Sequence, residues 1–297
     1  MSILVNYVND VLAPTPDQHR FIKRMKRSII KALKNNSPIT PKEVYIGGSF
    51  SRGSMLRQFI DADIIFVYNN SKDAEKNWRN LATVIYNVLE DNFPDRKIIE
   101  AEKVSVNLVT EYEGTQVNFD IVPCYYVNSP KVMTAHLNSQ FYQGITTIFH
   151  TRYISRYKNY PYFTYVVRLL KDWKYSHNIK LKSFLLELIV IDVYENFYDD
   201  IDEITDIVDV LDNCFDDILQ TLNGVPVIPS NWRYCNPDNY DVKYETPHIF
   251  CPGNPVDNLL NYLTKKEINN IKRKVFITRN NLQEGNYSDI FNTDYFD

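Results

Sequence analysis

Glycine, cysteine and histidine are scarce in this sequence of 297 residues, which holds 8, 4 and 5 of them respectively. The cysteines form no CxxC pair and the histidines show no metal-ligand spacing, so the pattern argues against a zinc site and favours reduced thiols. Because glycines are so few, each is a candidate for a backbone conformation that other residues avoid. Two of them stand together, at Gly47 and Gly48, directly before a serine.

Long apolar runs are also missing. The longest, Phe184 to Val193, is interrupted by Glu187 and Asp192 and is too short to cross a bilayer. No basic and apolar leader opens the chain. The net charge of −4 argues against a protein that wraps long nucleic acid. We therefore expect a cytoplasmic protein that has neither a membrane nor a stable long nucleic acid as its partner.

A glycine–serine turn followed by two carboxylates is the main chemical signal. Gly48 and Ser49 can bring backbone N–H groups and a hydroxyl close to phosphate oxygens. Asp61 and Asp63 then open the apolar run Ile64–Tyr68, which has the composition of a buried strand. Since side chains alternate along a strand, the two carboxylates share one face. Their mutual repulsion favours a divalent cation such as Mg²⁺ between them.

A third carboxylate lies on a predicted hairpin. Val104–Tyr112 alternates in part, Glu113–Thr115 turns, and Gln116–Pro123 returns as a strand that carries Asp120. An acid inside an apolar strand is costly unless it is paired or binds metal, although a buried aspartate capping a local turn is the alternative. If this strand neighbours the one with the first two carboxylates, all three can hold two metal ions for phosphoryl chemistry.

These residues resemble a known pattern. Gly48-Ser49, Asp61-x-Asp63 and Asp120 within VNFDIVP are similar to the polymerase-beta-type nucleotidyltransferases. The narrower resemblance is to the branch with oligoadenylate synthetases, cyclic GMP-AMP synthase and the bacterial cyclic-oligonucleotide synthases (CD-NTases). Archaeal CCA-adding enzymes share the core. The resemblance implies an α+β fold with a mixed sheet, a helical C-terminal lobe, and an active site in the cleft between them.

The resemblance continues into the second half of the chain. It implies that Lys171, with Lys174 as the second choice, and Ser183 contact a triphosphate, while Phe184 stacks on a base. The alternatives are a surface lysine, a serine that caps its helix, and a core phenylalanine. Cys251–Asn258 is similar to a proline–asparagine segment of oligoadenylate-synthetase-like chains, but a cysteine replaces the usual acid, so we assign it no function.

The resemblance also suggests two domains, a nucleotidyltransferase core with its N-terminal helix over 1–155 and a helical C-terminal lobe over 156–297. We expect Arg52 and Arg57 to be solvated, and a polar tail ending at Asp297 to be loose. Periodic apolar residues predict helices over 15–35, 73–91, 163–177, 183–197, 199–222 and 259–279, with an ordered loop over 224–255.

The leading functional hypothesis is synthesis of a cyclic or short linear oligonucleotide second messenger from NTPs, with two Mg²⁺ ions, or Mn²⁺ in their place, and release of pyrophosphate. Antiphage-type signalling is the expected setting, with a regulatory protein partner left open. Addition of nucleotides to an RNA 3′ end is the first alternative. An inactive nucleotide-binding regulatory module is the second, and an antibiotic-modifying nucleotidyltransferase the third.

Overall fold

The computed structural model describes residues 2–37, 40–68, 74–100, 105–127, 131–134, 147–198, 204, 206–230, 247–252 and 254–297. It divides into two compact units, which we call the sheet unit, Pro14–Arg152, and the helical unit, Met1–Ala13 with Tyr153–Asp297. The predicted division at residue 155 differs from this one in placing the first 13 residues with the core.

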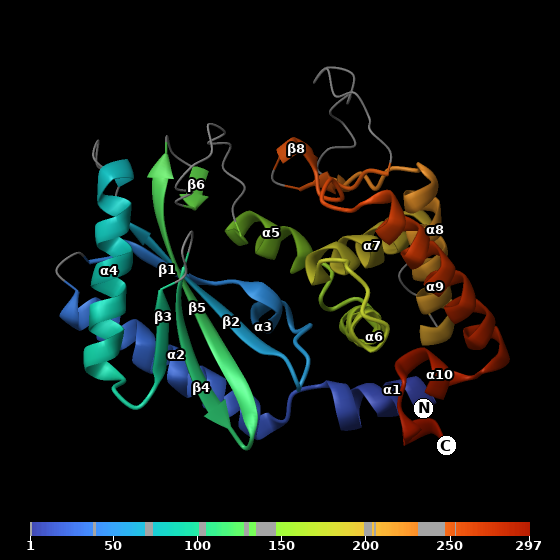
Figure 1. The fold of residues 1–297 in the computed structure, drawn as a ribbon, viewed down its shortest axis with the longest axis horizontal. Helices are drawn as coiled ribbons and strands as arrows, with labels where there is room; N and C mark the ends of the chain where they lie inside the picture. Colours follow the sequence, from blue (N-terminus) through green and yellow to red (C-terminus); the bar gives the residue numbers. More distant parts are fainter. Residues whose placement is uncertain are drawn as a thin grey trace. The chain divides into compact units, whose positions relative to one another are not determined.

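The sheet unit combines a mixed sheet with helices (Figure 1). Its sheet has the order β1-β2-β5-β4-β3, with β6 paired to β5. Only β2 and β5 are parallel among the described strand pairs of this sheet. The elements are α2 (Pro16–Asn36), β1 (Glu43–Ile46), α3 (Gly48–Arg52), β2 (Ile60–Tyr68), α4 (Ala74–Asn92), β3 (Lys97–Glu100), β4 (Val106–Tyr112), β5 (Thr115–Val127), β6 (Lys131–Thr134) and α5 (Thr147–Ile154).

The two faces of this sheet differ. On one face, Ile64 and Phe66 of β2 pack with apolar residues of α2 and α4 in the main core. The other face carries a small apolar cluster that includes Ile65 and Val67. Because side chains alternate along a strand, Asp61 and Asp63 belong to this second face. The strand pattern therefore places both carboxylates away from the main core.

The helical unit has α7 near its centre, where Leu185–Tyr194 are buried on every side of the helix. The helices α6 and α8 pack on it, and α9 packs on α8. The elements are α1 (Ile3–Tyr7), the π-helical turn η1 (Val8–Leu12), α6 (Phe163–Ser176), α7 (Ser183–Asn196), α8 (Ile207–Asn223), β7 (Phe250–Cys251), β8 (Asn254–Asn258), α9 (Lys265–Glu284), α10 (Tyr287–Phe291) and the 3₁₀ turn η5 (Asp294–Phe296).

Several helix ends follow from their caps. The predicted start of α2 is confirmed, because Thr15 and Gln18 form a capping box. Helix α8 begins at Ile207 and not at residue 199, since the Asp206 carboxylate accepts from Val208 N–H. Helix α9 begins after Thr264, which forms a capping box with Glu267, and not at residue 259. The period of apolar residues predicted that these helices exist, but the capping side chains determine their first residues.

The chain ends pack together, contrary to the prediction of a loose tail. Tyr7 lies 5.5 Å from Phe291 and 4.7 Å from Phe296, measured between ring centroids. The Tyr7 hydroxyl also donates to Asp172 of α6 over 2.8 Å. These contacts bring residues 1–13 into the helical unit.

Other predictions are settled by the described residues. The predicted class, a mixed sheet followed by a helical C-terminal part, is confirmed. Cys124, Cys214 and Cys251 are buried free thiols, and Cys235 lies outside the described residues. The predicted loop at 224–255 ends within the short hairpin β7–β8, whose second strand continues to Asn258, while 231–246 and 253 lie outside the described part. In that part, no helix combines the length and apolar character needed to cross a membrane.

Candidate functional site

The parallel pairing of β2 with β5 brings the predicted carboxylates to neighbouring strands. Asp61 is in register with Asn118, and Asp63 with Asp120. Because the strands are parallel and in register, all four side chains lie on the same face of the sheet. The prediction that these two strands are neighbours is confirmed.

Gly48 makes room for the carboxylate of Asp63. Its φ of +68° is in the left-handed region, and a Cβ at this position would lie 1.8 Å from Asp63 Oδ2. The N–H of Gly47 also donates to the Asp63 carbonyl over 3.0 Å. Only glycine combines that backbone conformation with so close an approach. Ser49 follows as the second residue of α3 and is partly exposed.

Arg52 places a positive charge near Asp63, and the prediction that Arg52 is solvated is wrong. The residue is only 7% exposed, and its guanidinium lies 3.5 Å from the hydroxyl of Thr151. Burial raises the pKa of Asp63, the Arg52 charge lowers it, and the neighbouring Asp61 raises it further. Arg52 therefore compensates part of the negative charge on this face.

Asp120 is the least satisfied of the three carboxylates. Its Oδ1 atom is buried and has no hydrogen-bond partner among the described residues. Burial, followed by the charges of Asp63 and Asp61, raises the pKa of Asp120 to about 6. Asn107 stands opposite it on β4, and the buried Oδ1 of Asn107 likewise lacks a partner within the described residues. A hard cation would satisfy such oxygens.

Asp61 is exposed, and its carboxylate accepts a hydrogen bond from the side-chain amide of Asn118. Its Oδ1 accepts from Asn118 Nδ2 over 2.7 Å, and Asn118 Oδ1 accepts from Gln116 Nε2 over 2.8 Å. Among the described residues, no group of three or more His, Cys, Asp or Glu is already arranged as a metal site. The carboxylate and amide oxygens are suitable ligands for a divalent cation, but in this structure they do not form a complete coordination site.

In the helical unit, the two candidate lysines have different surroundings. Lys171 is buried and its Nζ lies 3.1 Å from Glu187 Oε1, with side chains 5% and 0% exposed. Lys174 is partly exposed; its Nζ donates to Ser183 Oγ over 3.2 Å and lies 4.3 Å from the Tyr175 ring centroid. Lys171 thus serves an internal ion pair, whereas Lys174 and Ser183 are together and accessible.

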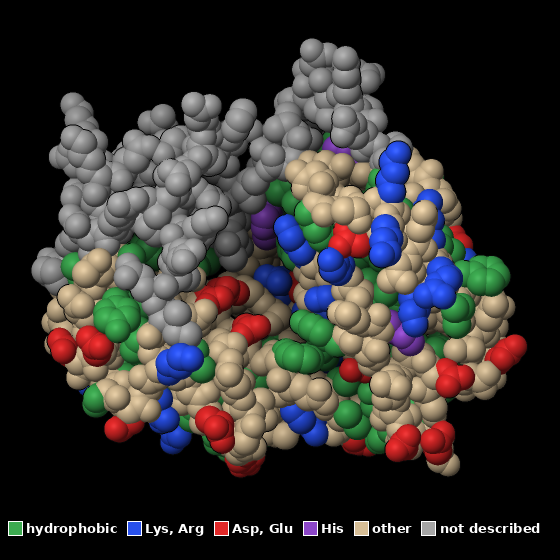
Figure 2. All heavy atoms as spheres, in the orientation of Figure 1, with side chains coloured by type: hydrophobic (Ala, Val, Ile, Leu, Met, Phe, Trp, Pro, Cys, Tyr) green, Lys and Arg blue, Asp and Glu red, His purple; other side chains and the backbone are tan. Residues whose placement is uncertain are grey.

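Ser183 and Phe184 open helix α7. The residue in the capping position is Lys182, which provides no side-chain hydrogen bond, so the alternative that Ser183 caps this helix is wrong. Phe184 is half-buried, which places it neither fully in the core nor fully in solvent. On the viewed face, Figure 2 shows several Lys and Arg side chains over the helical unit.

Comparison with known proteins adds to this geometry. Residues 26–142 match the family model described as nucleotidyltransferase domain. The matched residues include Asp61, Asp63 and Asp120, so the similarity spans all three predicted carboxylates. A CBASS oligonucleotide cyclase CdnC of Escherichia coli (strain KTE188) is 28% identical to this chain over 183 residues, 59% of this chain and 58% of that protein. A cyclic AMP-AMP-AMP synthase of E. coli (strain MS 115-1) is 27% identical over 187 residues, 60% of this chain and 58% of that one. The chain thus spans less than two thirds of the length of these relatives.

Solved structures share the fold of this chain. E. coli MS115-1 CdnC with ATP aligns with a TM-score of 0.72 at 19% identity, covering 99% of this chain and 95% of that one. Vibrio cholerae DncV cyclic AMP-GMP synthase with nonhydrolyzable GTP aligns with a TM-score of 0.66 at 13% identity, covering 95% and 89%. At these identities both alignments show a shared fold, in agreement with the fold expected from the sequence.

Sequence reasoning gave no role to four residues that the structure places next to candidate site residues: Arg52, Asn107, Asn118 and Glu187. For Glu187, a local signal was present, because a carboxylate in the mostly apolar helix α7 needs a partner. Asn118 stands two residues before Asp120, so it shares that face of the strand. The burial of Arg52 and the place of Asn107 had no comparable local signal, because both depend on how distant strands and helices meet.

Proposed function

We propose that this chain is a metal-dependent nucleotidyltransferase that joins NTPs into a cyclic or short linear oligonucleotide with release of pyrophosphate. The observation that carries the proposal is the register of Asp63 with Asp120, where a buried carboxylate oxygen lacks a hydrogen-bond partner within the described part of the chain. The relatives named as oligonucleotide cyclases support the choice of product class.

The metal assignment follows from the donor chemistry. Asp61 and Asp63 would hold the ion that binds the triphosphate, and Asp120 would complete a second site with them. We favour two Mg²⁺ ions, with Mn²⁺ as an alternative, because the ligands are hard oxygens. When bound, these ions would supply charge neutralisation for the triphosphate and acidify the attacking hydroxyl.

The reaction can be written with the residues of the sheet unit. The hydroxyl oxygen of one nucleotide attacks the α-phosphorus of another, a new P–O bond forms, and the bond to the β-phosphate oxygen breaks to release pyrophosphate. Asp120, whose pKa is raised to about 6, can accept the hydroxyl proton near neutral pH. Gly48 and Ser49 would stand next to the phosphates, and Arg52 would limit the negative charge around Asp63.

In the helical unit, we assign the triphosphate contact to Lys174 and Ser183. The Lys174 amine and the Ser183 hydroxyl lie 3.2 Å apart and can bind a phosphate oxygen in concert. Lys171, the first choice from the sequence, would act as support, because a phosphate would have to displace its buried partner Glu187. Phe184 remains our proposed base-stacking residue.

The setting is also a proposal. We infer a cytoplasmic enzyme of antiphage signalling, since two relatives are named as CBASS oligonucleotide cyclases. A regulatory protein partner is supported by the structure of E. coli MS115-1 CdnC in complex with HORMA-deltaN, which aligns with a TM-score of 0.74. We expect no stable complex with long nucleic acid, in keeping with the net charge of −4.

The decisive experiment is mass spectrometry of the products formed from all four NTPs with Mg²⁺ or Mn²⁺, with and without tRNA. The variant Asp61→Asn with Asp63→Asn should lose at least about 10³-fold in pyrophosphate release. The exposed Asp95→Asn serves as the matched control in the same unit. Products that form only with RNA would favour 3′-end addition. Equal pyrophosphate release by wild type and the double variant would favour a binding module.

A further inference from the structure

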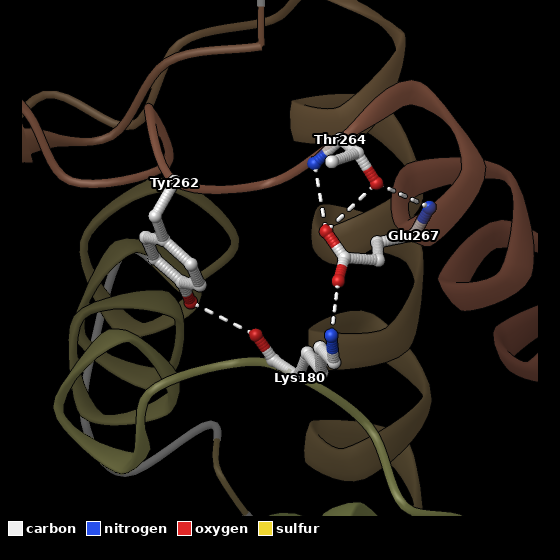
Figure 3. A network of polar contacts seen from close by, with 4 residues as sticks. All are labelled: Lys180, Tyr262, Thr264 and Glu267. Carbon is white, nitrogen blue, oxygen red and sulfur yellow. Dashed lines mark hydrogen bonds and ion pairs between the residues drawn. The ribbon is translucent and has the colours of Figure 1, made fainter.

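The hydroxyl of Tyr262 holds the backbone that connects α6 to α7. Its Oη accepts from the Lys182 N–H and donates to the Lys180 carbonyl, both over 3.0 Å. Figure 3 shows the ring of Tyr262 directed at this segment from the stretch that precedes α9. A single phenol therefore fixes two backbone groups that lie two residues apart in a connection without regular structure.

The side chains of Lys180 and Lys182, in the same connection, also contact residues at or just before the start of α9. The Lys180 amine pairs with the Glu267 carboxylate, and Glu267 also accepts from the N–H and hydroxyl of Thr264, each over 2.8 Å (Figure 3). The Lys182 amine lies 4.6 Å from the Tyr262 ring centroid, within the range of a cation–π contact. The connection is thus tied to the start of α9 at several points.

Tyr262 is itself positioned by the proline–asparagine segment noted in the sequence. Asn258, the last residue of that segment, uses its Oδ1 to accept from Leu260 N–H over 2.9 Å. Its Nδ2 donates to the Pro247 carbonyl over 2.9 Å. These bonds fix the turn that follows β8. They therefore also fix the position of the backbone from which the side chain of Tyr262, two residues after Leu260, extends. Asn258 therefore has a structural task that the similarity of its segment to other chains did not identify.

Ser183 follows Lys182 directly and is the first residue of α7. Lys182 supplies no side-chain cap to this helix, and its own backbone N–H donates to the Tyr262 hydroxyl. The Ser183 hydroxyl in turn meets the Lys174 amine. We propose that Tyr262 is a positioning residue, which holds the first turn of α7 so that Ser183 and Lys174 together bind a nucleotide phosphate. This role rests on the proposed nucleotidyltransferase function.

The test compares Tyr262→Phe with wild type. The phenylalanine keeps the ring and its contact with Lys182 but loses both hydrogen bonds, so the fold should persist. We expect the KM for ATP to rise about 3- to 10-fold while kcat stays within about 2-fold, because ground-state phosphate binding is lost rather than chemistry. In the absence of nucleotide, amide hydrogen exchange over residues 180–185 should accelerate by about the same factor.

A matched control is Tyr295→Phe, which removes a hydroxyl that donates to Asp10 in the same unit. It should change neither the KM nor exchange at 180–185. If wild type turns over ATP and Tyr262→Phe keeps the wild-type KM, the positioning role is overturned and the proposed function stands. If wild type neither binds nor turns over ATP, the proposed function fails and this role with it, whereas faster exchange alone would then report only a structural contact. A larger change at kcat than at KM would also overturn the role.

Discussion

Buried charge is handled in opposite ways in the two units. In the helical unit, Lys171 and Glu187 lie 3.1 Å apart, and each compensates the other in surroundings that exclude water. In the sheet unit, Asp63 and Asp120 sit side by side in register, and the buried Oδ1 of Asp120 has no hydrogen-bond partner among the residues described there. The first arrangement is complete as it stands, whereas the second carries unsatisfied negative charge.

The two arrangements differ in their capacity to bind a ligand. A satisfied buried ion pair stabilises its surroundings only if both partners are present, and it has no capacity left for a ligand. A carboxylate cluster with a raised pKa is unfavourable until a cation binds, so the free energy that it costs the fold becomes available for ligand binding. Perturbed carboxylates of this kind are typical of functional sites. The comparison predicts that removing a charge has opposite effects in the two places.

Breaking the satisfied pair should give the largest effect. Lys171→Met leaves the Glu187 carboxylate, which is 0% exposed, without its cation. We expect the free energy of unfolding in urea to fall by about 3–5 kcal/mol. The matched control is Lys180→Met, because the side chain of Lys180 is 68% exposed in its pair with Glu267. That change should cost less than about 1 kcal/mol. A double variant, Lys171→Met with Glu187→Leu, should recover most of the loss; failure to recover would mean that the pair has a further role.

The second prediction concerns a buried carboxyl group in the helical unit. Asp217 of α8 is 5% exposed, and its Oδ2 lacks a hydrogen-bond partner among the described residues. Burial, then the charges of Asp192 on α7 and of Asp216, raises its pKa to about 8. Since Arg279 of α9 pairs with Asp216, that cation is already engaged. Asp217 is therefore a buried carboxyl that favours its protonated form.

The sign of the pH effect follows from this raised pKa. A carboxyl whose pKa is higher in the folded than in the unfolded chain binds its proton more tightly when folded, so stability falls as pH rises from about 4 towards 8. Asp217→Asn should remove this contribution and stabilise the chain by about 2–4 kcal/mol at pH 9 relative to wild type. Thermal unfolding between pH 5 and 9 measures it. Asp216→Asn, which loses a pair with Arg279, should instead destabilise, and equal pH profiles for wild type and Asp217→Asn would contradict the prediction.

The third prediction removes a charge from the unsatisfied cluster. Without metal, Asp120→Asn should raise the free energy of unfolding at pH 8 by about 1–2 kcal/mol, because the cost of burying the charge and the repulsion from Asp63 and Asp61 both disappear. Added Mg²⁺ or Mn²⁺ should stabilise wild type and not the variant. Asp61→Asn is the control for stability, since Asp61 is exposed and should change it little without metal. A destabilised Asp120→Asn would show that the carboxylate is paired in solution.

Sequence reasoning reached what depends on local pattern. Alternation placed Asp61 and Asp63 on one face, and the apolar run around Asp120 marked a neighbouring strand of the same sheet. Sequence reasoning did not predict the burial of Lys171. A period of apolar residues shows which face of a helix is buried, but it does not show which residues of other elements pack there. The partner of Lys171, Glu187, is 16 residues away on another helix, and Tyr262 meets Lys182 across 80 residues. Such contacts depend on the packing of whole elements, which no short pattern records.

The smallest predicted effect lies at the edge of the carboxylate cluster. Because Gln116 Nε2 donates to Asn118 Oδ1, the Asn118 amide must turn its Nδ2 towards Asp61, and the Asp61 carboxylate is oriented by that donor. Asn118→Ala should weaken Mn²⁺ binding by about 2- to 10-fold, less than the loss of a ligand, because only the orientation of Asp61 changes. Electron paramagnetic resonance of free Mn²⁺ measures it without turnover. Gln116→Ala should do less still, since Asn118 stays and only its amide direction is released. If Asn118→Ala tightened Mn²⁺ binding, the hydrogen bond would be one that holds Asp61 away from the metal, and the cluster would have to give up that contact before it could bind a cation.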